Sequence, residues 1–177
     1  MNPLDIIAKY YPVGSEAYRI LVIHSRSVAD KALAIARMHP EMNLDLTFVE
    51  EAAMLHDIGI FRCNAPDIDC HGDAEYICHG YLGAELMRAE GYPRHARVCE
   101  RHTGTGITLA MIEERGLPLP HRDFMPETLE EQLICYADKF YSKTKLDKEK
   151  SVEKVKQGLS KYGTKLSNGL ITGVNSF

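Results

Sequence analysis

Apolar residues recur along this chain mostly three or four positions apart, which is the spacing of amphipathic helices, and no alternating run predicts a long strand. The longest such stretch predicts a helix from about Ser15 to His39, with Ser15 as N-cap and Pro40 ending it. Its inward stripe is Ile20, His24, Val28 and Ile35. A histidine in an otherwise apolar stripe is therefore the first candidate for chemistry.

Two segments have the sequence of a capping box, in which a Thr and a Glu three residues later cap a helix start reciprocally. The first, Thr47 to Glu50, predicts a helix that carries the dipeptide His56-Asp57 and breaks at Gly59. The second, Thr128 to Glu131, predicts a helix that continues to about residue 145. Both helices place acidic or imidazole side chains near their C-terminal halves.

Shorter helices are predicted between and after these two. One is expected at about 76–90, ending at Gly91, and a short one at about 93–102, with polar loops at 63–73 and 117–126. A last amphipathic helix at about 151–162 presents one apolar face, made of Val152, Val155, Leu159 and Tyr162.

The whole pattern predicts an all-α bundle of about six or seven helices. We expect one domain over residues 1–177, with a core at about 20–141 that carries the chemistry and a C-terminal amphipathic segment at about 146–166.

Composition is that of a soluble protein, with 45% hydrophobic residues and a net charge of −4. This charge does not favour nucleic acid as a partner, and no apolar run is long enough to span a bilayer. The N-terminus does not resemble a signal peptide, and the five cysteines show no close pairing pattern. We therefore expect a cytoplasmic protein with reduced thiols and no membrane association.

The candidate chemistry lies in a few histidines and aspartates. His56-Asp57 places a nitrogen ligand beside an oxygen ligand, and the two oxygens of Asp57 can bridge two metal ions. His24 and Asp138 lie on inward helix faces, where a polar group is costly unless it is paired or binds a metal. Two such residues from distant helices suggest a shared cation.

The string Leu55-His56-Asp57-Ile58-Gly59 resembles the HD superfamily of metal-dependent phosphohydrolases, whose minimal signature is H…HD…D. His24 precedes the string, and Asp138 follows it within Tyr136-Ala137-Asp138-Lys139. His79, in His-Gly-Tyr-Leu-Gly-Ala-Glu-Leu, and His102, in Arg-His-Thr-Gly, are similar to ligands of the dinuclear branch, which includes bacterial HD-domain diadenosine tetraphosphate hydrolases. Ile60 departs from the family, because many members have Lys there.

This resemblance implies a two-metal site in which Asp57 bridges the ions. His24, His56, Asp57 and Asp138 would hold one ion, and Asp57, His79 and His102 the other. A ligand set of imidazoles and carboxylates without thiolates favours Fe or Mn, with Co, Ni or Zn as alternatives. Besides Asp57, the candidate catalytic residues are cations beside the ligands or in the preceding loop: Lys139, Arg101 and Arg122.

The function implied is hydrolysis of a phosphoester or phosphoanhydride in a small, nucleotide-type substrate by a metal-bridged hydroxide. Three alternatives stay open: a mononuclear HD nucleotidase, a non-catalytic module that binds a nucleotide or a protein partner, and a di-iron oxygenase.

Two local features also have open interpretations. His95 lies one heptad before His102 and is a rival for its role. The lysine-rich segment 139–165 is either a phosphate-attracting rim or a solvated face, and the stripe at 152–162 is core or a homodimer contact.

Overall fold

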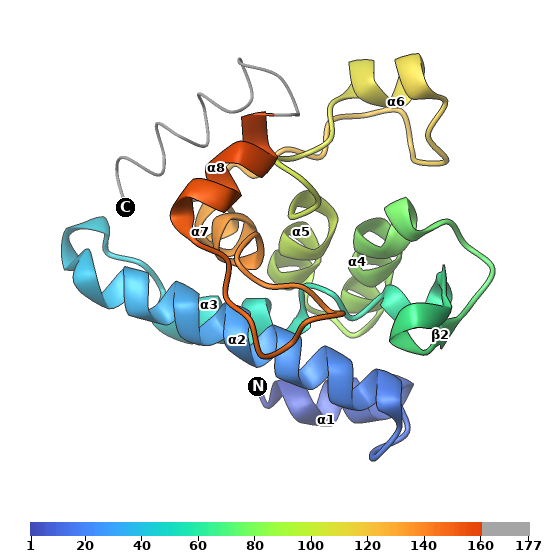
Figure 1. Cartoon of the computed structure of the whole chain (residues 1–177), viewed down its shortest axis with the longest axis horizontal. Coiled ribbons are helices and arrows are strands. Elements are labelled where there is room, and N and C mark those ends of the chain that lie inside the picture. The colour runs from blue at the N-terminus through green and yellow to red at the C-terminus, as the bar shows by residue number, and fades with distance from the viewer. Residues whose placement is uncertain (161–177) are drawn as a thin grey trace.

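The computed structural model describes residues 1–160. Over that range the chain forms eight α-helices and one small antiparallel sheet, so the all-α class is confirmed (Figure 1). The helices are α1 (Pro3–Tyr10), α2 (Glu16–Met38), α3 (Leu46–Leu55), α4 (His79–Ala89), α5 (Pro93–Arg101), α6 (Leu109–Arg115), α7 (Leu129–Asp138) and α8 (Val152–Ser160). The strands β1 (Asn64–Ala65) and β2 (Cys70–His71) lie in the expected loop.

Four helices surround a common interior. The long helix α2 packs against α3 and α7, and α5 packs against α3, α4 and α7 (Figure 1). Fully buried aliphatic side chains from three of these helices fill the space between them, among them Leu21, Val28, Val49, Leu133 and Ile134. The ends of α3, α5 and α7 therefore meet beside the middle of α2, which is where the candidate ligands lie.

Two of the predicted helix N-caps are confirmed and one is wrong. The hydroxyl of Ser15 accepts from the backbone N–H of Tyr18 at the start of α2, as predicted, and Thr128 and Glu131 form the predicted capping box of α7. The box predicted at Thr47 is wrong. Asp45 caps α3 instead by accepting from the N–H of Phe48, because its carboxylate reaches the first turn two residues earlier.

Two helices were not predicted, although their caps are visible in the sequence. Helix α1 has Asn2 as N-cap and Pro3 in its first turn, and α6 runs from the N-cap Thr108 to Gly116 with φ +59°. The C-terminal end of α1 contacts the turn that follows His56-Asp57. The buried hydroxyl of its C-cap residue Tyr11 donates to the carbonyl of Ile58 over 2.7 Å. The same hydroxyl accepts from the N–H of Phe61, so α1 fixes the turn after His56-Asp57.

Helix α7 ends at Asp138, seven residues before the predicted end. Three successive N–H groups, from Lys139 to Tyr141, bond three residues back, which tightens the chain out of the helix. The following loop returns across the front of the bundle before α8 begins.

In α8, Val155 and Leu159 are buried against Phe140, which favours the core interpretation of that stripe. Val152 is 40% exposed, so its placement in the stripe was wrong, and Tyr162 lies outside the described residues.

Gly59 allows the turn after Asp57 to lie directly against α4. Its φ of −82° suits any residue, but a Cβ at this position would collide with the carbonyl oxygen of His79 and the backbone N of Gly83. Gly80 plays the matching part between α4 and α5, since its Cβ would meet the carbonyl oxygen of Cys99. Two glycines thus bring three ligand-bearing segments into close contact.

We expect the substitution Gly59→Ala to lower the free energy of unfolding by about 1–3 kcal/mol, because both colliding atoms belong to the backbone and cannot move alone. Urea unfolding followed by circular dichroism measures this. Gly158→Ala is the matched control: nothing lies within 4 Å of its Cβ position in α8, so it should be neutral or slightly stabilising. Equal effects of the two substitutions would contradict the close-packing argument.

Candidate metal centre

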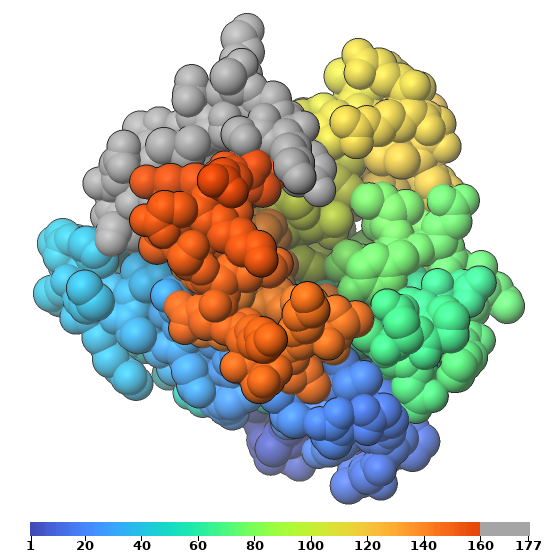
Figure 2. Space-filling model, in the orientation of Figure 1, coloured from blue at the N-terminus to red at the C-terminus, as the bar shows by residue number. Residues whose placement is uncertain are grey.

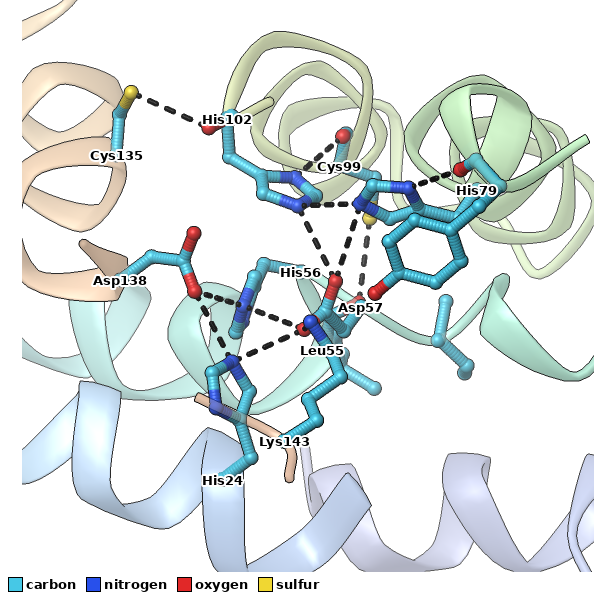
Figure 3. A network of polar contacts seen from close by, with 12 residues as sticks. His24, Leu55, His56, Asp57, His79, Cys99, His102, Cys135, Asp138 and Lys143 are labelled. Atoms are coloured by element: carbon cyan, nitrogen blue, oxygen red, sulfur yellow. Dashed lines mark hydrogen bonds and ion pairs between the residues drawn. The ribbon is translucent and has the colours of Figure 1, made fainter. Parts of the chain in front are cut away.

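Six polar side chains from five segments point toward one another in the interior of the bundle (Figure 3). Helix α2 contributes His24 from its middle, and the end of α3 contributes His56 and the following Asp57. The first residue of α4 is His79, the C-cap of α5 is His102, and the last residue of α7 is Asp138. The predicted ligand positions thus come together, mostly at helix ends.

The first group consists of His24, His56, Asp57 and Asp138, whose ligand atoms all lie within 4.8 Å of one another. Nε2 of His24 lies 3.1 Å from Oδ2 of Asp57 and 3.0 Å from Oδ1 of Asp138. Nε2 of His56 faces the same two oxygens at 3.1 and 3.4 Å. Two imidazoles and two carboxylates therefore converge on one point.

The second group shares Asp57 with the first but uses its other oxygen. Oδ1 of Asp57 lies 3.4 Å from Nε2 of His79 and 3.2 Å from Nε2 of His102. The two imidazole nitrogens are 3.0 Å apart. Because each oxygen of one carboxylate faces a different pair of histidines, Asp57 is placed as a bridge between the groups.

Three of the histidines are held in one tautomer by their own backbone. Nδ1 of His56, His79 and His102 lies 2.6, 2.6 and 2.7 Å from the carbonyl oxygen of the residue three positions earlier. A carbonyl oxygen can only accept, so each Nδ1 carries the hydrogen and the neutral ring leaves Nε2 with a free lone pair. This is the usual arrangement of histidines that bind a metal through Nε2.

The electrostatics of the cluster call for a cation. Burial lowers the pKa of His79 to about 3 and also lowers the pKa of His102, so both rings are neutral. Their Nε2 lone pairs then face each other with no hydrogen between them. Among residues 1–160, Nε2 of His56 and both oxygens of Asp57 are buried without a well-aligned hydrogen-bond partner. The cluster is therefore able to bind a divalent metal, which satisfies all of these atoms at once.

The carboxylates are ionised. Burial disfavours the charge of Asp57, but His56 and Lys143 hold its pKa well below the usual range, and Lys139 does the same for partly buried Asp138. Burial also opposes a charge on His56, yet Asp57 and Asp138 raise its pKa to about 10. A metal bound at this group would displace that proton.

Lys143 was not among the predicted site residues. Its ammonium lies 2.6 Å from Oδ2 of Asp57, and its side chain is only 14% exposed (Figure 3). Burial alone would lower the pKa of Lys143, but the neighbouring charge of Asp57 outweighs this and holds the pKa above its ordinary value. Lys143 therefore stays protonated. In the sequence it is one of many lysines after α7, and the predicted continuation of that helix gave no reason to choose it.

The three predicted cations occupy different surroundings. The ammonium of Lys139 lies 2.8 Å from Oδ2 of Asp138 and donates to the carbonyl of His102, so it contacts a candidate ligand directly. Arg101 pairs with Glu127 and donates to the carbonyl of Met125, while Arg122 pairs with Glu100. Both arginines are thus engaged in ion pairs with glutamates, and their catalytic roles stay predictions.

Two other expectations concern residues near the cluster. His95, the rival of His102, is buried against Glu51 at 3.1 Å and does not join either group. All five cysteines are buried and free, as the irregular spacing predicted.

The cluster borders a cleft that is lined by several lysine side chains. One part, about 450 Å³, is lined by Asp138 and Lys143 together with Asn64, Asp67 and Tyr76. An adjoining part of about 590 Å³ shares Tyr76, Asp138, Tyr141 and Lys150 with it and adds Gly104, Lys139, Lys154, Val155, Gly158 and Leu159. Figure 2 shows this face, with the orange residues of α8 and of the loop after α7 on one side and the green residues around β1 and β2 on the other. Within residues 1–160, a small molecule in this cleft would lie beside Asp138, Lys139 and Lys143.

A helical bundle with such a buried His/Asp cluster belongs to the class of α-helical metal-binding domains. Residues 21–142, more than half of the chain, match the family model described as the HD domain. The chain therefore belongs to the HD domain family. Across residues 1–160, no helix has the length and apolar character needed to cross a membrane.

Three relatives share substantial sequence with the chain. It is 37% identical over 128 residues to an uncharacterised protein of Methanocaldococcus jannaschii, in a match that covers 71% of this chain and 68% of that protein. It is 33% identical over 140 residues to a tRNA (cytidine(56)-2'-O)-methyltransferase of Thermoplasma volcanium, covering 78% of this chain and 35% of the relative. It is 32% identical over 147 residues to the enzyme of that name in Picrophilus torridus, in a match that covers 82% of this chain and 37% of that protein.

The chain thus spans only about a third of the length of these two methyltransferases. Among solved structures, the HD domain of the phosphodiesterase PgpH from L. monocytogenes matches with a TM-score of 0.55 and 16% identity. The match covers 98% of this chain and 97% of that one. At this identity the likeness shows the fold alone.

Proposed function

We propose that this protein is a phosphohydrolase that uses two divalent metal ions bound by the six-residue cluster. The observation that carries the proposal is the position of Asp57, whose two oxygens each face a separate group of imidazoles. His24, His56 and Asp138 would complete one site, and His79 and His102 the other. Membership of the HD domain family and the fold of the PgpH domain support this assignment.

The bound ions would supply a hydroxide at neutral pH and neutralise the charge of a phosphoryl group. The residues of the chain would hold them in place. Backbone carbonyls orient the three imidazoles through Nδ1, and Lys139 holds the carboxylate of Asp138 through its second oxygen. Imidazole and carboxylate ligands favour Fe or Mn, with Co, Ni or Zn as alternatives.

The cleft supports a small nucleotide-type substrate. Lys150 and Lys154 line it, and within the described part of the chain neither ammonium has an ion-pair partner, so both are available to phosphate oxygens. The rings of Tyr76 and Tyr141 line the shared part of the cleft and can pack against a base. Anionic and aromatic parts of one molecule would thus each find a matching surface.

We expect the purified wild-type protein to contain about two transition-metal ions per chain and His79→Ala to contain about one, because only the second group loses a ligand. Elemental analysis of protein purified without chelator or affinity-column metal measures this. His95→Ala is the control, since it removes a buried histidine outside the cluster and should keep two ions. One ion in all three proteins would favour the mononuclear nucleotidase, and none after loading with Fe or Mn would leave a binding module.

We expect the double variant Lys150→Gln and Lys154→Gln to raise KM for a hydrolysed nucleotide about three- to tenfold, with kcat little changed, because these cations contact the substrate away from the metals. Mononucleotides and diadenosine polyphosphates are the first compounds to assay, in air and without oxygen. Replacing Lys148 and Lys156, which are exposed and lie outside both parts of the cleft, makes the same charge change and should leave KM unaltered. Product formation only in air would instead indicate an oxygenase.

A second candidate substrate is a phosphate group on RNA. It is favoured by the sequence similarity to two proteins named as tRNA methyltransferases, although the chain covers only part of each. Short RNA oligonucleotides with a 5′- or 3′-phosphate, assayed beside the nucleotides, distinguish the two substrates. Preference for the oligonucleotide would replace the small-nucleotide proposal and keep the metal centre.

A further inference from the structure

We infer that Lys143 is a further substrate-binding residue that exchanges one partner for another. Its ammonium pairs with Asp57, and when ions occupy the cluster it would contact the phosphate of the substrate instead. This inference rests on the proposed function and adds a residue for which the HD signature has no position.

The position of Lys143 is defined by several contacts. Its ammonium lies 2.6 Å from Oδ2 of Asp57 and 5.8 Å from the centre of the Tyr76 ring. The side chain extends inward from a turn in which the N–H of Lys145 bonds the carbonyl of Ser142. The N–H of Lys150 bonds the carbonyl of Phe140 and closes the base of this loop. A largely buried ammonium paired with Asp57 and hydrogen-bonded to the Tyr76 side chain is therefore built into the fold.

Metal binding must disturb this ion pair. Oδ2 of Asp57 is also the oxygen that faces His24 and His56, so a divalent ion in the first group would use the oxygen that Lys143 contacts. The ammonium and the ion repel each other at such distances, and the ion carries the larger charge and has more ligands. Lys143 would then be left partly buried beside a cation, which is unfavourable unless an anion approaches it.

The cleft supplies the route by which such an anion arrives. Lys143 lines the part of the cleft that also contains Asp138 and Tyr76, so its ammonium can turn toward this space on its flexible four-carbon stem while the backbone stays in place. A phosphate bound to the ions would lie beside it. Ile60 is buried and apolar, so the position where many HD proteins carry a lysine supplies no cation here.

The test uses the substitution Lys143→Met, Mn²⁺ and inorganic phosphate as probes. We expect the variant to bind Mn²⁺ about tenfold more tightly than wild type, because a competing cation has been removed from Asp57. We expect the Mn²⁺-loaded variant to bind phosphate about ten- to a hundredfold more weakly, because a charged hydrogen bond has been lost. Isothermal titration calorimetry measures both affinities.

Opposite changes in the two affinities are not expected from a residue that only stabilises the fold. Weaker binding of both probes, or wild-type affinity for both, would overturn the inference. Lys143→Arg keeps the charge and should retain phosphate binding without the gain in Mn²⁺ affinity, which covers the case in which Lys143→Met does not fold. Lys148→Met, on the exposed part of the same loop, is the control and should match wild type.

These results also separate the two proposals. A wild-type protein that binds no Mn²⁺ contradicts the proposed function itself. A wild-type protein that binds two ions and hydrolyses nucleotides, while Lys143→Met binds phosphate normally, contradicts only the role of Lys143.

Discussion

The structure depends on one buried charge, the carboxylate of Asp57, at the point where four helices meet. An ionised carboxylate in that position is very costly without compensation. Nitrogens of His24, His56, His79, His102 and Lys143 lie 2.6–3.4 Å from its two oxygens. Of these groups, protonated His56 and Lys143 compensate the charge, whereas the neutral rings of His79 and His102 face it with lone pairs. The bundle is therefore organised around an electrostatic centre, and the apolar packing of α2, α3, α5 and α7 holds these groups in position.

Much of this arrangement could be predicted because it is local in sequence. The signature residues, the long helix starting after Ser15 and the capping box at Thr128 all follow from patterns within a few residues. The end of α7 and the role of Lys143 could not be predicted, since they depend on how the chain returns over the cluster. A lysine beside other lysines gives no periodic signal, and only tertiary contact selects one of them.

The same distinction explains the errors at helix ends. Asp45 and Thr47 are both good N-cap residues, and the choice between them depends on where α3 must begin to reach α2. Val152 satisfies the spacing of an inward stripe, but the neighbours that bury Val155 and Leu159 do not extend to it. Patterns of sequence identify candidates, and packing between distant segments selects among them.

The bonds from Nδ1 to the carbonyl three residues earlier have a thermodynamic consequence. His56, His79 and His102 lose their rotational freedom when their own helix turns form, before any ion arrives. The entropic cost of ordering these side chains, on the order of 1 kcal/mol each, is therefore part of the free energy of folding and does not reduce the affinity for a metal ion. A site preorganised in this way can exchange one metal ion for another while the rings stay in place. The metal that it holds then depends on which ions are available as well as on their affinities.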